Sequence, residues 1–449
     1  MTAAVRDLRQ IVGDANAVAP TTNSPYLFDA TEARGLHGHA DAVVLPGSAE
    51  EVALVVAWCY ERGIAIVPRG GGTGFAGGAV PFGGIVLALD RLNRVRSFDP
   101  LLWRMEVEAG VRTHEVRRAA RESGLLFPPD PGAAEQSQIG GNIATNAGGP
   151  HAFKYGVTGA WVTGLEVVVA PGEIVSFGGP IRKDVSSLDF KSLLIGSEGT
   201  LGIITAAWLK LAPAPETTLP IAAFYADAAT GCAAIEAVYG NGLIASALEY
   251  LDAGTLALAG ASFPSGIPDD AGFLVIAEAD GTADAATRLR DELRDVLAEG
   301  AIRIDHPEPR DLWRWRDGVS IAVTAALGGK VSEDIVVPVD RLANAIDATV
   351  AIGKRHGLEA VSWGHGGDGN LHSTFLLSHE DPDALERAER ASDELFKLAI
   401  VLGGSISGEH GLGLVKRGHA GWSPRLTELH TAIKRTFDPE GLFNPGKKL

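Results

Sequence analysis

The chain has 449 residues, a net charge of −17 and two cysteines, and these quantities argue against several classes of protein. The length predicts two or three domains with ample core. The acidic balance argues against nucleic-acid binding. Two cysteines are too few for an iron–sulfur cluster, which normally takes four. No apolar run reaches the ~18 residues of a membrane span and no signal peptide is recognised, so we expect a cytoplasmic protein.

A glycine-rich stretch, Arg69–Gly78, dominates the first part of the chain. It follows the apolar run Ile64–Val67, which predicts a buried strand. A segment with so few side chains can fold back tightly and turn its backbone N–H groups toward an anion. We therefore interpret this stretch as a loop that holds a phosphate.

The spacing of Gly72, Gly74 and Gly77 also satisfies the dinucleotide-binding fingerprint. That fingerprint opens a helix in a Rossmann fold. Here Ala79–Gly84, which contains Pro and Gly, leads instead into a second strand-like run, Ile85–Leu89. The strand–loop–strand context favours a phosphate cradle in another fold over a Rossmann fold or a plain structural turn.

A second stretch of small residues runs from Gln138 to Gly149. Its glycines, alanines and asparagines have too little bulk for a core element, so we predict a long loop. Loops of this length are usually functional or disordered, and the apolar elements on both sides argue against disorder. Such a loop can press amides and carboxamides against a large planar ligand. A third glycine stretch, Gly196–Gly202, leads into a strand-like run.

Residues 221–360 alternate helical and strand-like segments, which predicts an α+β domain. Pro213, Pro215 and Pro220 mark the boundary before it. Within this domain, Trp313–Asp317 begins with two Trp-Arg pairs. Arginine binds carboxylates bidentately, so this segment can form a carboxylate-binding wall. The alternative is the end of an amphipathic helix with arginine on the surface.

The C-terminal part holds the densest set of metal-ligating residue types. His365 and His372 flank a glycine turn, and Glu409 follows in a second glycine-rich segment. Two histidines and one carboxylate suit a divalent metal and leave positions open for a substrate. The alternative is that the histidines cap and hydrogen-bond their own loops.

Taken together, these stretches resemble flavoproteins of the vanillyl-alcohol oxidase / p-cresol methylhydroxylase type. Within that type they resemble the branch of the glycolate oxidase FAD subunit, the D-lactate dehydrogenases and D-2-hydroxyglutarate dehydrogenase. The motifs that carry the resemblance occur in family order from about residue 40 to the end of the chain. They are Pro68–Gly74, Ile139–Gly149 with Lys154–Val157, Gly196–Gly202, Gly364–His372, Ser405–Gly411 and Leu442–Gly446.

The resemblance implies an α+β fold, in which an FAD-binding domain of two α/β subdomains is joined by an α+β substrate cap domain. We expect the FAD-binding domain in residues 1–215, the cap in 216–405, and a C-terminal segment, 406–449, that returns to the FAD-binding domain. The implied FAD-binding positions are Pro68, Arg69, Gly70, Gly71, Gly72, Thr73, Gly74, Gly77, Gly78, Pro129, Asp130, Gln138, Ile139, Gly140, Gly141, Asn142, Ala144, Asn146, Gly148, Gly149, Tyr155, Gly156, Glu198, Gly199, Gly202, Ile203 and Asn444.

The resemblance also implies a reaction, the oxidation of a D-2-hydroxy acid to a 2-oxo acid. Arg316 and Lys330 would hold the substrate carboxylate, and Ser320 lies where relatives often have a hydroxyl residue. His410 would take the hydroxyl proton while the Cα hydride passes to flavin N5. A divalent ion, Zn or Mn, would lower the pKa of the hydroxyl. Its ligands would be His365, His372 and Glu409.

Two departures from the family pattern refine these expectations. Relatives that bind FAD covalently carry a His within the glycine loop or a second attachment residue. Here Gly71–Thr73 contains no His, so we predict dissociable FAD. Thr374 stands where some 2-hydroxyglutarate enzymes have Asn, which favours a smaller or different hydroxy acid.

The expected partners are a 2-hydroxy acid substrate and an electron acceptor, which is oxygen, a quinone, a cytochrome, an electron-transfer flavoprotein or a partner subunit. A homodimer and partner subunits are both compatible with the sequence. Two alternative functions stay open. One is an FAD subunit of a glycolate oxidase that is inactive without its partners. The other is a non-redox flavoenzyme that resembles alkyl-dihydroxyacetone-phosphate synthase.

Overall fold

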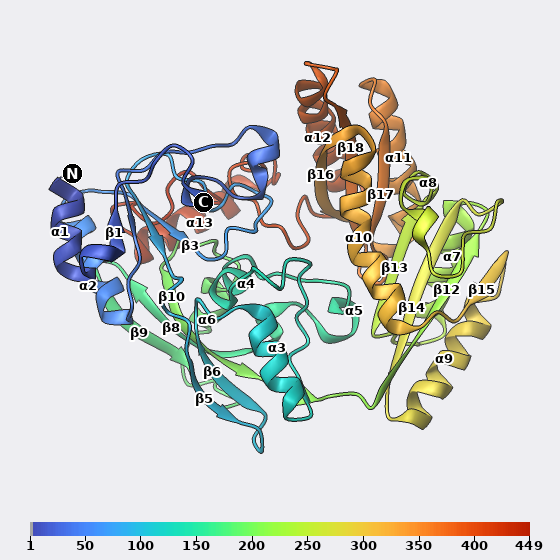
Figure 1. Cartoon of the computed structure of the whole chain (residues 1–449), viewed down its shortest axis with the longest axis horizontal. Coiled ribbons are helices and arrows are strands. Elements are labelled where there is room, and N and C mark those ends of the chain that lie inside the picture. The colour runs from blue at the N-terminus through green and yellow to red at the C-terminus, as the bar shows by residue number, and fades with distance from the viewer. Residues whose placement is uncertain (1–2) are drawn as a thin grey trace. The chain divides into compact units, whose positions relative to one another are not determined.

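The structure, a computed structural model, describes residues 3–449, and the chain forms two compact units. Unit 1 comprises the residues up to Gly148, Val157–Pro213 and Glu409–Leu449. Unit 2 comprises Gly149–Gly156 and Ala214–Gly408. The chain therefore leaves unit 1 twice and returns each time, so that unit 1 takes residues from both ends of the sequence (Figure 1).

Unit 1 is built on a small sheet with parallel pairing and a larger antiparallel sheet. The small sheet has the order β1 (Ala17–Val18), β2 (Ala42–Val44), β4 (Ile85–Ala88) and β3 (Ile66–Arg69). The larger sheet has the order β5 (Val95–Asp99), β6 (Arg104–Glu108), β10 (Ile203–Lys210), β8 (Val162–Val169) and β9 (Glu173–Gly178). A short pair joins β7 (Leu125–Leu126) to β11 (Ala212–Pro213). The helices of unit 1 are α1 (Ala3–Val12), α2 (Ala49–Tyr60), α3 (Thr113–Glu122), α4 (Ile139–Thr145), α6 (Phe190–Leu194) and α13 (Pro424–Phe437).

The glycine stretch connects β3 to β4, which confirms the strand–loop–strand prediction. The two strands pair in parallel, with Ile66 opposite Ile85. The C-terminal segment lies beside β3, because the N–H of Ile66 donates to the Leu442 carbonyl and the N–H of Asn444 donates to the Ile66 carbonyl, both at 2.8 Å. The end of the chain is thereby held next to the start of the glycine loop.

The prediction of a loop over residues 138–149 is wrong, because Ile139–Thr145 form the helix α4. The helix ends at Asn146, which adopts left-handed backbone with φ 55°. It needs small residues because it packs against the end of β6: a Cβ at Gly140 would lie 2.6 Å from the Ala109 Cβ. Close packing against the sheet here outweighs the low helix propensity of glycine.

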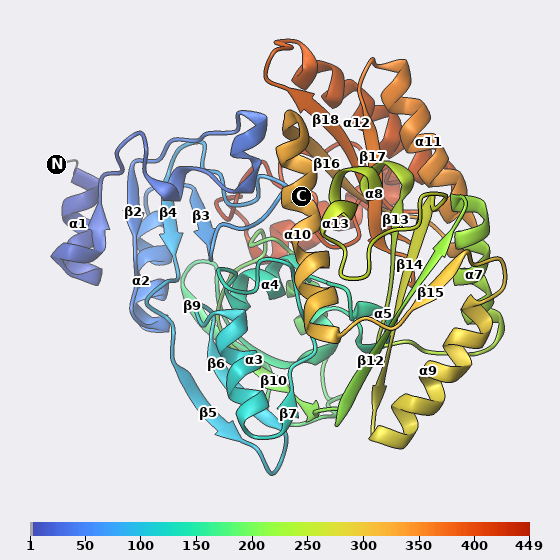
Figure 2. The same cartoon turned by 45° about the vertical axis from the view of Figure 1, so that its right-hand side comes forward.

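Unit 2 is built on one antiparallel sheet with helices on both faces (Figure 2). Its order is β15 (Arg303–Asp305), β12 (Thr217–Tyr225), β14 (Phe273–Gly281), β13 (Ala247–Asp252), β17 (Ala360–His365), β18 (Asn370–Ser378) and β16 (Gly328–Val336). The helices α8 (Ala253–Ala259) and α10 (Pro309–Leu327) cover one face. The other face is contacted by α7 (Ala228–Gly240), α9 (Ala283–Leu297), α11 (Leu342–Arg355) and α12 (Ala384–Val401). The short helix α5 (Ala152–Tyr155) lies in Gly149–Gly156, a segment of unit 2 that is flanked in the sequence by residues of unit 1. Across residues 3–449, no helix combines the length and apolarity of a membrane span.

Two adjacent glycines of α4 give a matched test of this packing. We expect Gly140→Ala to destabilise unit 1 by about 1–3 kcal/mol, because the added methyl collides with Ala109. At Gly141 a Cβ meets no atom of the described residues within 4 Å, so Gly141→Ala keeps or raises stability by up to about 1 kcal/mol through helix propensity. Denaturant unfolding of the FAD-free protein measures both. Equal effects of the two substitutions would contradict the packing of α4.

Candidate functional site

The glycine loop presents a row of unpaired main-chain donors. Within residues 3–449, none of the amides from Gly70 to Gly78 donates a hydrogen bond to another protein group. Gly72 and Gly77 have φ values of 68° and 74°, a backbone conformation that glycine adopts freely. A loop with its N–H groups unpaired is an anion-binding concavity, so this geometry suits a pyrophosphate.

A buried cation lies under this loop. The side chain of Arg69 donates from Nη1 to the Phe28 carbonyl at 2.7 Å, and its guanidinium lies 5.7 Å from the centroid of the Tyr26 ring. A Cβ at Gly72 would fall 1.9 Å from Arg69 Nη2, so the loop folds directly over the guanidinium. Burial lowers the pKa of Arg69, which means that its charge is poorly solvated and would be stabilised by a nearby anion.

The glycine segments that the sequence singled out meet in unit 1. Gly70 lies against Gln138, with 3.4 Å between its ideal Cβ position and Gln138 Oε1. Gly199 lies against Pro68 in the same way, and Gly202 and Ile203 lie at the start of β10, where Ile203 is fully buried. The first, second and third glycine stretches are therefore neighbours in space.

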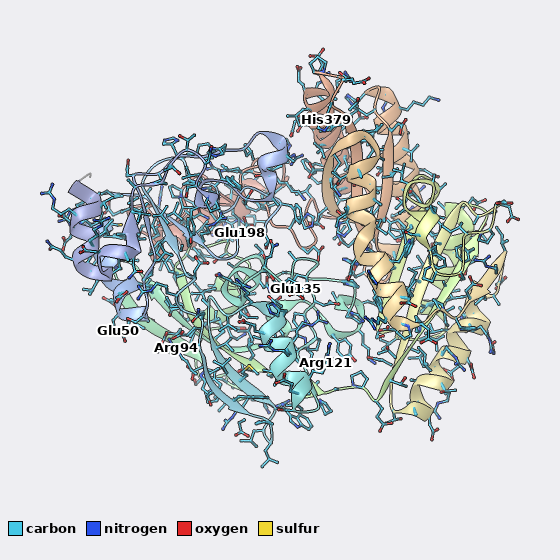
Figure 3. All side chains as sticks on the ribbon, in the orientation of Figure 1. Glu50, Arg94, Arg121, Glu135, Glu198 and His379 are labelled. Carbon is cyan, nitrogen blue, oxygen red and sulfur yellow. The ribbon has the colours of Figure 1, made fainter. Side chains whose placement is uncertain are left out.

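Glu198 and Asn444 join these segments to the C-terminal part of unit 1. Glu198, labelled in Figure 3, accepts hydrogen bonds from the Leu412 N–H at 2.9 Å and the Gly413 N–H at 2.7 Å. The Asn444 side chain donates to the carbonyls of Gly78 and Glu198, at 2.9 and 2.8 Å. Both residues have left-handed backbone, with φ values of 55° and 42°. Asn444 thus joins the end of the glycine loop to the third stretch, and Glu198 joins the third stretch to the segment that follows His410.

Two buried acceptors in this region have no protein partner. Asn444 Oδ1 and Gln138 Oε1 lack a hydrogen bond to any described residue, although the nitrogen of each carboxamide is bonded. Buried polar groups are nearly always paired, so these two oxygens fit a ligand that supplies donors. Within the part of the chain that the structure describes, a Cβ at Gly74 or Gly141 would meet no atom within 4 Å, which leaves room beside the loop and beside α4. The donors, the acceptors and this space fit FAD.

Other predicted FAD-binding residues have contacts within the protein. Asn142 donates to the Thr113 hydroxyl at 2.5 Å, which joins α4 to α3, and Asn146 accepts from the Gly159 N–H at 2.8 Å. Tyr155 donates to Asp280 of β14. Gly149, Tyr155 and Gly156 belong to unit 2, whereas Gly148 and Ala144 belong to unit 1. Pro129 is buried and Asp130 half-buried in the segment before α4.

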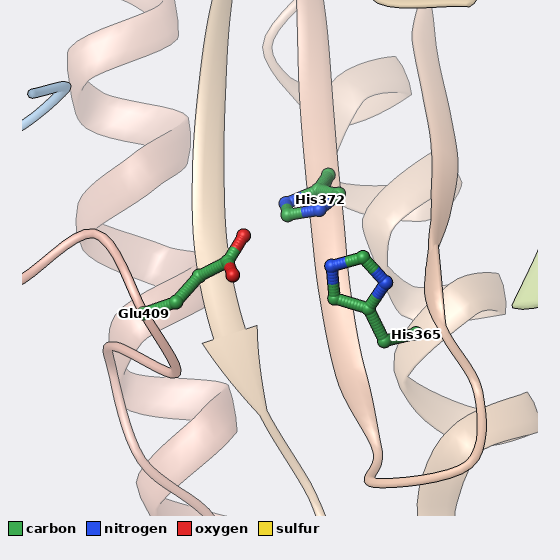
Figure 4. A group of neighbouring side chains, drawn as sticks. All are labelled: His365, His372 and Glu409. Carbon is green, nitrogen blue, oxygen red and sulfur yellow. The ribbon is translucent and has the colours of Figure 1, made fainter. Parts of the chain in front are cut away.

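The strands β17 and β18 bring the two predicted metal-ligating histidines together. In the antiparallel register Trp363 lies opposite His372, and His365 follows two positions after Trp363 on the same face of the sheet. The imidazole centroids are 5.2 Å apart. Figure 4 shows both rings with the Glu409 carboxylate facing them. Each residue offers one ligand atom, and these three atoms lie within 4.8 Å of one another.

A buried aspartate holds the segment that carries Glu409. Asp334, fully buried in β16, lies opposite His372 in the sheet. Its carboxylate accepts hydrogen bonds from the Ser407 hydroxyl and from the Gly408 N–H, each at 2.9 Å. Since Glu409 directly follows Gly408, these bonds fix the backbone that leads into the third predicted ligand.

His410 is placed next to Glu409 and beside the glycine loop. Its Nε2 is 3.7 Å from Glu409 Oε1. Its ring centroid lies 4.8 Å from that of Phe75, which belongs to the loop. The predicted base is therefore next to the residues that would hold the FAD pyrophosphate.

The two predicted carboxylate-binding cations have different surroundings. Arg316 of α10 is only 7% exposed and pairs with Glu249 of β13, with 2.8 Å between Nε and Oε2. Lys330 of β16 is half-buried, donates to the Ser320 carbonyl at 2.8 Å and to its hydroxyl at 2.5 Å, and lies 5.2 Å from the Trp363 ring centroid. Burial lowers the pKa of Lys330 to about 8.

The sequence analysis did not predict Glu249 and Asp334 as residues of the candidate site. Both are fully buried carboxylates in sheet strands, and both contact the segments that carry the candidate metal ligands. The signal for Glu249 is visible in the sequence, because an acidic residue interrupts the largely apolar run 243–251. Buried acidic residues are rare unless they are paired, so such an interruption marks a residue with a specific partner.

Comparison with known families covers most of the chain. Residues 40–178 match the family described as FAD binding domain. Residues 214–448 match the family described as FAD linked oxidases, C-terminal domain.

Individual proteins are similar over nearly the whole chain. "Glycolate oxidase subunit GlcD" of Bacillus subtilis is 35% identical over 430 residues, 94% of this chain and 91% of that protein. "D-2-hydroxyglutarate dehydrogenase" of Xanthomonas citri pv. viticola is 37% identical over 429 residues, 90% of this chain and 88% of that protein. Among solved structures, p-cresol methylhydroxylase with bound substrate aligns with a TM-score of 0.83 at 19% identity, over 99% of this chain and 96% of that chain, which shows a shared fold. The chain belongs to the FAD-linked oxidase family and is an FAD-binding oxidoreductase.

Proposed function

We propose that this flavoprotein oxidises a D-2-hydroxy acid to the corresponding 2-oxo acid, with a divalent cation at His365, His372 and Glu409. The observation that carries the proposal is the grouping of these three side chains directly beside His410. The relatives named above are a glycolate oxidase subunit and a D-2-hydroxyglutarate dehydrogenase, which supports a substrate of the 2-hydroxy acid class.

The donor set fits a divalent ion such as Zn or Mn. Ligand atoms that are each ~2.1 Å from one ion lie about 3 to 4 Å apart. The three ligand atoms lie within 4.8 Å of one another, which is close to that spacing. When bound, the ion would polarise the substrate hydroxyl and leave coordination positions for the carboxylate.

Each step of the proposed reaction has a residue to perform it. Lys330 and Arg316 bind and orient the carboxylate of the acid through charge-assisted hydrogen bonds. His410 takes the proton from the hydroxyl group, since a neutral imidazole is a suitable base near neutral pH. FAD, when bound, supplies the acceptor for the hydride that leaves Cα. The lack of a histidine in the loop Gly70–Gly78 supports dissociable FAD.

An anaerobic titration tests the proposal directly. We expect the visible absorbance of FAD to bleach on addition of one D-acid among D-lactate and D-2-hydroxyglutarate, or on addition of the achiral acid glycolate, because the flavin is reduced when the substrate is oxidised. The matching L-isomers should leave the spectrum unchanged. Treatment with a chelator should abolish bleaching while FAD stays bound, and added Zn or Mn should restore it.

Other outcomes of this titration separate the alternatives. FAD that no acid reduces would rule out independent oxidation of a hydroxy acid and favour a subunit that needs partners or a non-redox flavoenzyme. Bleaching that is unaffected by the chelator would be consistent with the proposed substrate but would exclude a role for the metal ion.

The base assignment is tested with His410→Ala. Loss of a general base typically lowers the rate by 10²- to 10⁴-fold, and we expect flavin reduction to slow by a factor in this range. Stopped-flow absorbance measures the rate, and the FAD content of the purified variant is the control. A variant that retains FAD and is reduced at the wild-type rate would exclude His410 as the base.

The lowered pKa of Lys330 predicts a pH dependence of substrate binding. With a pKa of about 8, Lys330 is charged below pH 8 and loses its proton above it, so its attraction for the carboxylate weakens as pH rises. We expect KM for the acid to rise by up to about tenfold per pH unit above 8. Lys330→Arg, whose guanidinium stays charged, should flatten this part of the profile. A wild-type KM that is constant from pH 7 to 9.5 would contradict the role of Lys330.

A further inference from the structure

Glu249 is a buried carboxylate in the strand β13. It is fully buried, and every residue of that strand from Ala247 to Asp252 is buried as well. Removing a carboxylate from water is expensive unless specific partners compensate for the lost hydration. The identity of its partners therefore indicates what this residue does.

The register of the sheet brings Glu249 to His365. In the antiparallel pairing of β13 with β17, Tyr250 lies opposite Gly364, and one step further along the same register Glu249 lies opposite His365. Side chains directly opposite each other in a sheet share a face. The two side chains are in contact, with 2.5 Å between Glu249 Oε1 and His365 Nδ1.

The second oxygen of the same carboxylate contacts Arg316. Glu249 Oε2 lies 2.8 Å from Nε of Arg316 and 2.5 Å from its Nη2. One carboxylate thus connects the helix α10 to the strand that carries His365. One oxygen contacts His365 and the other contacts Arg316, and both of these residues belong to the proposed site.

The bond to Glu249 determines which nitrogen of His365 faces the candidate ion. An ionised carboxylate only accepts hydrogen bonds, so the proton of a neutral His365 lies on Nδ1. The other nitrogen, Nε2, then carries the lone pair that a metal requires. Carboxylates in this position orient metal-ligating histidines and raise their basicity.

We propose that Glu249 is a positioning residue that orients His365 for the divalent ion and holds Arg316 in place for the substrate carboxylate. This inference rests on the proposed function and goes beyond it, because it assigns the geometry of both halves of the site to one side chain that touches neither the ion nor the substrate. Glu249 is 116 residues from His365 and 67 from Arg316 in the sequence, so only the folded unit 2 joins them.

A purely structural ion pair is the competing explanation, and metal affinity distinguishes the two. A structural role would change the stability of unit 2 and leave the affinity of folded protein for the ion unaltered. Loss of a residue that orients a metal ligand typically weakens metal binding by about 10- to 100-fold. The measurement is the Kd for Zn²⁺ and for Mn²⁺, by chelator competition, on the FAD-loaded full chain after removal of bound metal.

The substitution is Glu249→Gln, which keeps the shape of the side chain and removes its charge. We expect its Kd for the ion to rise by about 10- to 100-fold. The matched control is Glu278→Gln in the neighbouring strand β14. Glu278 is also buried and paired, with Trp313 Nε1 at 2.7 Å and His151 Nε2 at 3.0 Å, and has no contact with the candidate ligands among the described residues. Its variant should bind the ion within about twofold of wild type.

A second measurement needs no substitution of Glu249. In the metal-free wild-type protein, ¹⁵N-histidine NMR should show His365 with its proton on Nδ1, and His365→Gln assigns the signal. A proton on Nε2 would overturn the inference. It is also overturned if Glu249→Gln binds the ion as tightly as wild type, or if Glu278→Gln weakens binding equally. If wild type itself binds neither ion, the metal proposal fails as a whole, which is a different result from a failure of Glu249 alone.

Discussion

The antiparallel register of β13, β17, β18 and β16 is the constraint on which the candidate catalytic centre depends. It places Glu249, His365 and His372 on one face of the sheet and sets Asp334 opposite His372. A shift of one residue in any of these strands would turn its polar side chains to the other face. The apolar residues of the same strands pack under α8 and α10, so the hydrophobic core holds the register that the polar residues need.

Three buried carboxylates hold glycine-rich segments and a histidine side chain in position through hydrogen bonds. Glu198 holds the main chain just after His410, and Asp334 holds the main chain just before Glu409. Glu249 does the same for a side chain, that of His365. In each case a buried carboxylate accepts hydrogen bonds from N–H or O–H donors away from water, where hydrogen bonds are electrostatically stronger than in water. Glycine-rich segments, which have little packing of their own, are positioned in this way.

Much of the local structure could be predicted from the sequence. The apolar run Ile64–Val67 predicts a buried strand, and β3 begins within it, at Ile66. The second strand-like run, Ile85–Leu89, contains β4, which spans Ile85–Ala88. The helix α4 was missed because glycine disfavours helices in isolation, and only the contact with Ala109 explains why glycine is required there. Helix propensity reflects the preference of an isolated segment, whereas its structure in the folded protein also depends on packing against neighbouring elements.

By itself, the sequence determined the strand–glycine loop–strand unit, the types of candidate ligand and the family, because these depend on residue identity and short spacing. It singled out His365, His372 and Glu409 as a possible metal set but gave no distance between them. Tertiary structure decided that their ligand atoms lie within 4.8 Å and that Glu249 pairs with both His365 and Arg316. Those contacts join strands and a helix far apart in the chain, and their formation depends on strand register and core packing, which no local pattern encodes.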